Sequence, residues 1–407
     1  PTRLSSDLES VLMYLTSFVH REDLFHIAER WFCGQPEAND ALRLTEILIS
    51  DGFVLGETLG ALADSMLGAI HDELPRKKHI YLKGELRDAL CAGSEEMTPR
   101  VEELIRMYRK NPDYYYREAP INGVLCFGAD DRLLGVYRIK RPRRIAEKAN
   151  RKIATWIFHL VQGQAREMAR QRAAEAGVPL EYLLSPEEVM TREFVEAEEY
   201  VARSFSEGHI QFDRDSLAIH DVGGMKVIAG QEKLAQLEKH LAADPRIRII
   251  EKETYHGPYQ ATNLILDVLW DADQVCRSYE ASRGWERYRN RGIPEERLRR
   301  EFDALLEGGH PSIFVEVILS TYPETVESEL GNCIHEKRIV AQRENRLYKG
   351  NISMNVEFLL EYLFAVGFSP CVKVDRLPIK LWGRYLPDTL SHQIRTLYDL
   401  GGYELFY

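Results

Sequence analysis

The segment that most constrains the fold of this chain is Ala218–Gly230, with the sequence AIHDVGGMKVIAG. Its β-branched pair Val227-Ile228 favours a buried strand. Directly before the predicted strand Met225–Ala229, Gly223-Gly224 allows another backbone or a ligand to approach closely. One carboxylate, Asp221, lies at the entrance to this strand. The segment therefore predicts a core strand with an acidic residue at its start. An aspartate there is either an ordinary strand-entry residue after a turn or a metal ligand.

Length and composition indicate a globular protein of two or three domains. The chain has 407 residues, of which 44% are hydrophobic and 29% are charged. No apolar run approaches the roughly 20 residues that span a bilayer, so we expect no membrane association and a cytoplasmic location. The formal net charge of −11 argues against general nucleic-acid binding. The six cysteines are scattered without zinc-site spacing, which predicts reduced thiols.

Residues 1–110 are predicted to be helical throughout. Ser5 or Ser6 can cap a first helix, and residues spaced three or four apart give that helix one apolar face: Leu8, Val11, Leu12, Leu15 and Val19. Thr98-Pro99 is a typical start for another helix, because proline suits the first helical position. We therefore expect a helical N-terminal domain.

After residue 110 the pattern changes to strands. Gly123–Gly128 and Leu133–Ile139, joined by a short polar turn, predict a hairpin. The basic segment Arg138–Lys152 follows and leads into residues 153–207, which we interpret as a helical insertion. Further strands are predicted at Ser216–Ala229, Arg246–Glu253, Ala261–Trp270 and Ile313–Leu319, and further helices at Gln231–Leu241, Glu324–Gln342 and Met354–Val366.

A second acidic residue, Glu316, lies inside the apolar strand Ile313–Leu319. Strand alternation places it on one face between Phe314 and Ile318. A carboxylate there is costly to bury alone, so it is solvated at a sheet edge, paired with a base or bound to a metal. Two strand-borne acids and a separate basic cluster are what phosphoryl-type transfer needs, since carboxylates hold Mg²⁺ and cations neutralise a triphosphate.

Several blocks of the sequence, in their order along the chain, resemble the RelA/SpoT-type alarmone synthetases. RIKRPRRIAEKANRK is similar to the pattern R-x-K-S-P-x-S-I-x-x-K, IHDVGGMKVI to D-[IL]-x-[AG]-[IV]-R-[IV]-[IV], and HGPYQATNLIL to N-G-Y-x-x-x-H. FVEVILST resembles V-E-[IL]-Q-[IL]-R-T, and SELGNCIHEKR resembles A-E-x-G-x-A-x-H-x-K. The resemblance covers roughly residues 120–340.

The resemblance implies a nucleotidyltransferase-like fold that transfers pyrophosphate from ATP to the 3′-hydroxyl of GDP or GTP. It implies Mg²⁺ at Asp221 and Glu316, the catalytic residues, and Tyr259 stacked on the acceptor guanine. Glu316 could also take the proton of the attacking hydroxyl. The other matched positions with an implied role in nucleotide binding are Arg138, Lys140, Lys148, Asn263, His335 and Lys337.

The chain departs from the family pattern at several of these positions. Lys226 and Ser320 stand where the family has arginine, Asn263 where it has histidine, Ile318 where it has glutamine, and Arg141 where it has serine. Arginine and lysine are not equivalent where a planar group grips phosphate. The alternatives are therefore a relative acting on adenine nucleotides or tRNA 3′ ends, or a degenerate module that binds a nucleotide or a protein partner. The lone His71-Asp72 pair does not predict the hydrolase domain found in full-length members.

The sequence thus predicts an α+β protein with a mixed β-sheet of about five strands flanked by helices. The expected parts are a helical domain at residues 1–110, a synthetase-like domain at 111–342 with the insertion at about 153–207, and an α/β appendix at 343–407. The sequence does not predict the oligomeric state.

Overall fold

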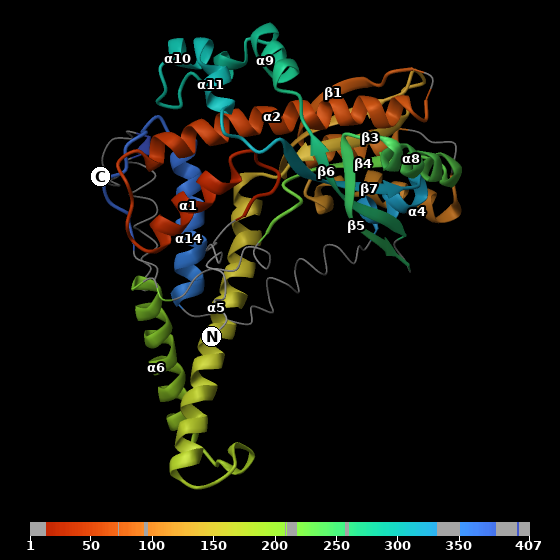
Figure 1. Ribbon diagram of the computed structural model, residues 1–407. Coiled ribbons are helices and arrows are strands. Elements are labelled where there is room, and N and C mark those ends of the chain that lie inside the picture. The colour runs from red at the N-terminus through yellow and green to blue at the C-terminus, as the bar shows by residue number, and fades with distance from the viewer. Residues whose placement is uncertain are drawn as a thin grey trace, which may run out of the picture.

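The structure is a computed structural model, which describes residues 14–71, 73–92, 97–207, 209, 218–256, 260–331, 351–379 and 397–398. These residues form an α+β fold with a mixed β-sheet flanked by helices, as the sequence predicted (Figure 1). The sheet has seven strands, where about five were expected.

The strand order in the sheet is β1-β2-β3-β4-β7-β6-β5. The parallel pair is β4 with β7, and each of the other neighbouring pairs is antiparallel. The strands are β1 (Arg76–Leu82), β2 (Pro120–Phe127), β3 (Leu133–Ile139), β4 (Gly223–Ile228), β5 (Ile247–Tyr255), β6 (Ala261–Leu269) and β7 (Ser312–Ser320). The predicted hairpin is confirmed as β2–β3.

The helices lie on both sides of this sheet and beyond its edges (Figure 1). The described α-helices are α1 (Arg21–Phe32), α2 (Asp40–Gly68), α3 (Lys83–Cys91), α4 (Pro99–Lys110), α5 (Pro142–Glu175), α6 (Glu187–Ser206), α8 (Gln231–Ala243), α9 (Ala272–Ala281), α10 (Glu295–Arg300), α11 (Phe302–Leu306), α12 (Tyr322–Leu330) and α14 (Asn351–Gly367). Short 3₁₀ turns are η1 (Pro112–Tyr115), η2 (Leu180–Tyr182) and η3 (Gly284–Tyr288).

Two hydrophobic clusters cover the two faces of the sheet. Leu125 of β2 and Ile228 of β4 belong to the smaller cluster, whereas their neighbours Cys126 and Val227 belong to the larger one. Successive strand residues point to opposite faces, so the clusters lie on opposite sides. Helices α3, α4 and α12 contribute to the smaller cluster, and α2 to the larger one. The smaller-cluster face also carries the polar site described below.

Two predictions for the N-terminal part are wrong. Arg76–Leu82 is not helical but forms the edge strand β1, in which Ile80 alone is buried. Residues 14–20 are not helical either, because Leu15 makes a parallel bridge with Ile219. The rest of that expected first helix, residues 5–13, lies outside the described residues. The division of the chain into three domains stays a prediction.

The helical character of residues 153–207 is confirmed. Helix α5 starts earlier than expected, at Pro142 in the basic segment, because proline there takes the first helical position after an extended Arg141. The outer part of α5 and all of α6 extend side by side away from the sheet, while the inner part of α5 packs against α14 (Figure 1). No helix in the described ranges has the length and apolar character needed to cross a membrane.

Candidate active site

Three neighbouring strands bring the site residues into one row. Arg138 of β3 is the register partner of Gly224 of β4, and Gly224 is the register partner of Glu316 of β7. Residues in register point to the same face, so Arg138 and Glu316 lie on one side of the sheet with a glycine between them. Asp221 lies two residues before the start of β4, and its side chain lines the same pocket as Arg138 and Glu316.

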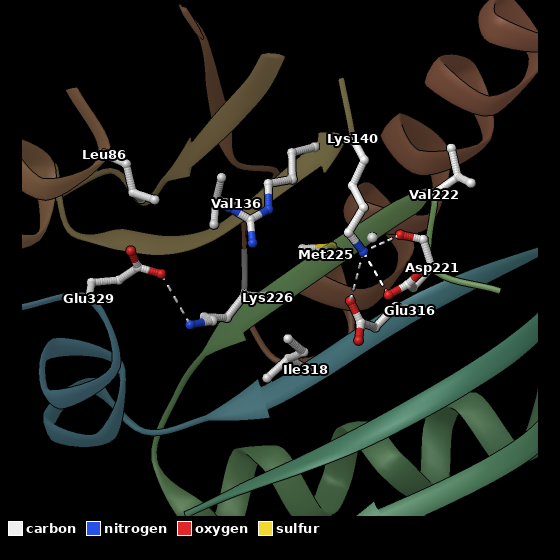
Figure 2. Close-up of a pocket in the computed structure, with 12 residues that line it drawn as sticks. Leu86, Val136, Lys140, Asp221, Val222, Met225, Lys226, Glu316, Ile318 and Glu329 are labelled. Carbon is white, nitrogen blue, oxygen red and sulfur yellow. Dashed lines mark hydrogen bonds and ion pairs between the residues drawn. The ribbon is translucent and has the colours of Figure 1, made fainter. Parts of the chain in front are cut away.

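Lys140 links the two carboxylates. Its Nζ lies 2.8 Å from Asp221 Oδ2 and 3.9 Å from Glu316 Oε2, and it also donates to the backbone oxygen of Asp221. Its backbone N–H donates to Val222 O at 2.8 Å, which fixes the segment between β3 and α5 beside the start of β4. Figure 2 shows the ammonium group between the two acidic side chains. The sequence prediction that Asp221 and Glu316 lie together therefore agrees with this geometry.

Lys148 adds a second cation to the same aspartate. It lies in the second turn of α5, and its Nζ is 2.5 Å from Asp221 Oδ2. Burial alone would raise the pKa of the Asp221 carboxyl, but Lys140 and Lys148 outweigh it and lower the pKa to about 2. Burial lowers the pKa of Lys140, against the opposing effect of Asp221 and Glu316. Asp221 is therefore a carboxylate at every physiological pH.

Asn263 of β6 contacts the other carboxylate. Its Nδ2 donates to Glu316 Oε1 at 3.2 Å, while Lys140 lies near Oε2. Asn263 Oδ1 is buried without a hydrogen-bond partner among the described residues. The amide thus orients Glu316 from the β6 side, in a position for which the sequence implied a nucleotide contact.

A second ion pair lies two residues further along β4. Lys226 Nζ donates to Ser328 Oγ at 2.9 Å and lies 3.5 Å from Glu329 Oε1, both on α12. Burial would raise the pKa of Glu329, but the charges of Lys226, Lys83, Arg138 and Arg87 lower it to about 2. No role was predicted for Glu329 from the sequence, although the residue stands at the glutamate of the pattern A-E-x-G in the block SELGNCIHEKR, which is the signal that could have identified it.

Several of these side chains line one pocket, drawn in Figure 2. Its charged residues are Arg138, Lys140, Asp221, Lys226, Glu316 and Glu329, and its other lining residues are Leu86, Val136, Val222, Gly224, Met225 and Ile318. With Lys148 included, four cations face three carboxylates. The site is thus locally cationic in a chain whose formal net charge is −11. Such a reversal of charge suits an anionic ligand.

The two carboxylates suit a divalent cation in chemistry. Mg²⁺ prefers oxygen ligands and usually takes one or two carboxylates, with waters and substrate phosphates as its other ligands. Asp221 Oδ1 is buried and has no hydrogen-bond partner among the described residues, which leaves one oxygen for such an ion. Within the described ranges no cluster of three or more His, Cys, Asp or Glu could hold a metal. Asp221 and Glu316 are thus the two residues that could hold such an ion, in exchange for their contacts with Lys140.

Three of the expected site residues cannot be placed. Tyr259, His335 and Lys337 lie outside the described residues, as does Asp72 of the His71-Asp72 pair. The structure thus brings together Lys140, Lys148, Asp221, Asn263 and Glu316, with Arg138 exposed at the pocket rim.

Among comparisons with known proteins, one with solved structures found similarity. No protein-family model matches the sequence, and a search of curated proteins found no significant match. Small alarmone synthetase 2 from Bacillus subtilis is similar at 10% identity and a TM-score of 0.18, over 37% of this chain and 64% of that one. Small alarmone synthetase 1 from Bacillus subtilis is similar at 9% identity and a TM-score of 0.20, over 52% of this chain and 92% of that one. The chain thus spans less than two thirds of the synthetase 2 structure. Scores this low support neither an activity nor a substrate by themselves.

Proposed function

We propose that the protein is a nucleotide pyrophosphokinase, which transfers pyrophosphate from ATP to the 3′-hydroxyl of GDP or GTP. The observation that carries the proposal is the convergence of Asp221 and Glu316 on the Lys140 ammonium, with Lys148 on the same aspartate. Two carboxylates and several cations at one point serve both metal binding and phosphate binding. The ordered sequence blocks that resemble the RelA/SpoT-type synthetases support the same reaction.

The reaction needs a base and a means of stabilising the leaving group. The acceptor 3′-oxygen attacks the β-phosphorus of ATP, a new O–P bond forms, and the bond between that phosphorus and the α,β-bridging oxygen breaks to release AMP. Glu316 is the group in this pocket that takes the hydroxyl proton, because Asp221 is held as a strongly acidic carboxylate by two lysines. Asn263 keeps Glu316 turned toward the reacting atoms.

The cations of the pocket bind the triphosphate. Lys140 and Lys148 are placed to offset the charge that develops on the phosphate oxygens, and Arg138 extends the cationic surface along β3. Mg²⁺, bound by Asp221 and Glu316, would supply Lewis-acid polarisation of the phosphates. In the proposal, Tyr259 stacks on the acceptor base, and His335 and Lys337 contact the nucleotides.

A second candidate is a nucleotide-binding module without transfer activity. Two contacts favour it: Lys140 lies between the carboxylates that would hold Mg²⁺, and Lys226 is engaged by Ser328 and Glu329 rather than free for phosphate. A transferase that uses adenine nucleotides or tRNA 3′ ends as acceptor is a variant of the first proposal. The three-part domain division belongs to the same proposal, with the site inside residues 111–342.

The decisive experiment is pyrophosphate transfer from β-labelled ATP to GDP, GTP, adenine nucleotides or tRNA, resolved by chromatography. Asp221→Ala should lose transfer by at least about 100-fold, since it removes a metal ligand and the partner of two lysines. Asp130→Asn, in the β2–β3 turn and half exposed, is the matched control and should retain the wild-type rate. Transfer that survives in Asp221→Ala would contradict the assignment.

Calorimetry with α,β-methylene ATP separates the two candidates. The pyrophosphokinase proposal requires that Mg²⁺ tighten binding of the analogue. Binding that is indifferent to Mg²⁺, together with no labelled product from any acceptor, would support the non-catalytic module instead.

A further inference from the structure

The segment Tyr14–His20, here called the bridging segment, connects the two chain positions that precede the site carboxylates. Ile219, two residues before Asp221, donates its N–H to Tyr14 O at 2.8 Å and accepts from Thr16 N at 3.3 Å. On the other side, Phe314, two residues before Glu316, donates its N–H to Thr16 O at 3.0 Å. The backbone of Thr16 therefore hydrogen-bonds both to the segment before Asp221 and to the segment before Glu316.

Side chains reinforce both contacts. Thr16 Oγ1 donates to Ile219 O at 3.0 Å and lies 2.9 Å from His220 Nδ1. Ser17 Oγ donates to Phe314 O at 2.6 Å. Both hydroxyl side chains are buried, so each hydrogen bond is made away from bulk water.

The position of the bridging segment explains why β4 and β7 separate at the site. Their parallel ladder begins at the pair Gly224 and Glu316. Upstream of this pair, the backbone of Thr16 hydrogen-bonds to both chains, as a third strand would. Asp221 is thereby outside the ladder, and its side chain can turn toward Lys140 and Glu316.

The bridging segment is itself held firmly. The guanidinium of Arg21 donates to Thr16 O at 2.8 Å and to Ser312 O at 3.3 Å, and both residues are buried. At the end of the segment, Asp51 of α2 accepts from His20 N at 2.7 Å, and its other oxygen lies 2.7 Å from His20 Nδ1. The bridging segment is thus fixed to α2 and to β7, and it fixes the backbone before Asp221 relative to both.

We propose that Thr16 and Ser17 are positioning residues, which set the separation of Asp221 and Glu316 and so determine metal and triphosphate binding. This inference rests on the proposed function for its effect on activity, but its structural part does not. Groups that orient metal ligands from outside the first coordination sphere typically change affinity or activity by about 10-fold to 100-fold when removed.

The test compares Thr16→Val, Thr16→Ser and the double variant Thr16→Val/Ser17→Ala with the wild-type chain. Thr16→Val keeps the branched shape and loses the hydroxyl, whereas Thr16→Ser keeps the hydroxyl. Thr45→Val is the matched control, because Thr45 is a buried threonine of α2 whose hydroxyl donates to Ala41 O at 2.8 Å. It shows what the loss of a buried hydroxyl does to folding alone.

The readouts are thermal unfolding and Mn²⁺ affinity in the presence of α,β-methylene ATP, measured by electron paramagnetic resonance. We expect Thr16→Val to weaken Mn²⁺ binding about 10-fold or more and the double variant to weaken it further. Thr16→Ser should stay within about twofold of the wild-type Mn²⁺ affinity. Thr45→Val should lower the thermal stability but leave the Mn²⁺ affinity unchanged. Equal Mn²⁺ affinity in Thr16→Val and the wild-type chain would overturn the inference.

A crystal structure of Thr16→Val distinguishes the two possible failures. The inference requires that Glu316 Oε2 or Asp221 Oδ2 move away from Lys140 Nζ, whose distances to them are now 3.9 and 2.8 Å. Unchanged distances overturn the positioning role whether or not Mn²⁺ binds. Absence of Mn²⁺ binding by the wild-type chain would instead overturn the proposed function, and the crystal distances alone would then decide the role of Thr16.

Discussion

Gly224 and Glu316 are register partners on adjacent parallel strands, and a β-carbon on Gly224 would lie 2.9 Å from the backbone oxygen of Glu316 and 3.3 Å from its β-carbon. Real β-carbons essentially never approach a neighbouring backbone so closely, and a backbone atom cannot move aside as a flexible side chain does. Glycine at this position therefore lets the Glu316 side chain lie over β4.

Gly224→Ala should displace Glu316 and impair both stability and transfer. Overpacking of this kind costs about 1–3 kcal/mol of unfolding free energy. A shift of the carboxylate by a fraction of an ångström should lower the transfer rate by about 10-fold or more. Urea unfolding and the labelled-ATP assay measure the two effects. Gly163→Ala is the matched control, since nothing lies within 4 Å of its added carbon on α5. It should gain about 0.5–1 kcal/mol and keep its rate.

Lys226→Met should leave the Glu329 carboxylate without the cation that lowers its pKa most. Removing one partner of a fully buried ion pair costs about 3–5 kcal/mol. This pair is largely but not fully buried, and Lys83, Arg138 and Arg87 also act on Glu329, so we expect about 2–3 kcal/mol here. A double-mutant cycle with Glu329→Gln should give a coupling energy of about 1–3 kcal/mol. The exposed pair Arg300–Glu296 is the control and should couple by less than about 0.5 kcal/mol. Equal coupling in the two cycles would contradict the buried pair's role.

Glu329 should make the stability of the protein depend on pH in acid. Its pKa is about 2 in the folded chain, against 4.5 for an ordinary glutamate. The unfolded chain therefore binds more protons between these values, so the contribution of Glu329 is complete above about pH 4.5 and is lost as the pH falls toward 2. The shift corresponds to roughly 3 kcal/mol. Urea titrations should show a flatter pH dependence for Glu329→Gln than for the wild-type chain, and parallel curves would refute the shift.

Lys140→Gln should change metal binding and transfer in opposite directions. The variant removes the ammonium that lies between Asp221 and Glu316, so Mn²⁺ affinity without nucleotide should rise by at least about 10-fold. Transfer should fall, because the same cation is proposed to bind the triphosphate. Lys239→Gln, on the exposed side of α8, is the control and should alter neither value. Unaltered Mn²⁺ affinity in Lys140→Gln would show that Lys140 does not compete for the metal position.

Local patterns in the sequence predicted much of the sheet. The alternation in Ile313–Leu319 and the apolar segments on either side of residues 129–132 correspond to β7 and to the β2–β3 hairpin. Strand β1 was not predicted, because its sequence RKKHIYL has one buried apolar residue, Ile80, and so shows no alternating pattern. Its run of cations suits the surface of a helix equally well. Edge strands commonly carry such charges.

Long-range contacts were the part that the sequence did not predict. The spacing of Leu15 and Val19 fits an amphipathic helix, but the backbone of this segment hydrogen-bonds to Ile219 and Phe314 instead. Nothing local to residues 14–20 indicates those partners. For Glu329, the block SELGNCIHEKR marked the position, but the pairing with Lys226 of a distant strand was not predictable from it. Asp221 and Glu316, in contrast, were identifiable because each is an acidic residue in an apolar strand context.

The parallel pairing of β4 and β7 has a consequence for the timing of assembly. Each half of the described sheet contains a hairpin of sequence neighbours, β2–β3 in one and β5–β6 in the other, and only β4 against β7 joins the halves. Local hairpins form quickly, whereas parallel strands far apart in sequence pair slowly. We therefore expect the contact between Asp221 and Glu316 to form after the two hairpins. A chain still being synthesised acquires this site no earlier than the emergence of β7, so the β2–β3 hairpin can be complete while Asp221 still lacks Glu316 beside it.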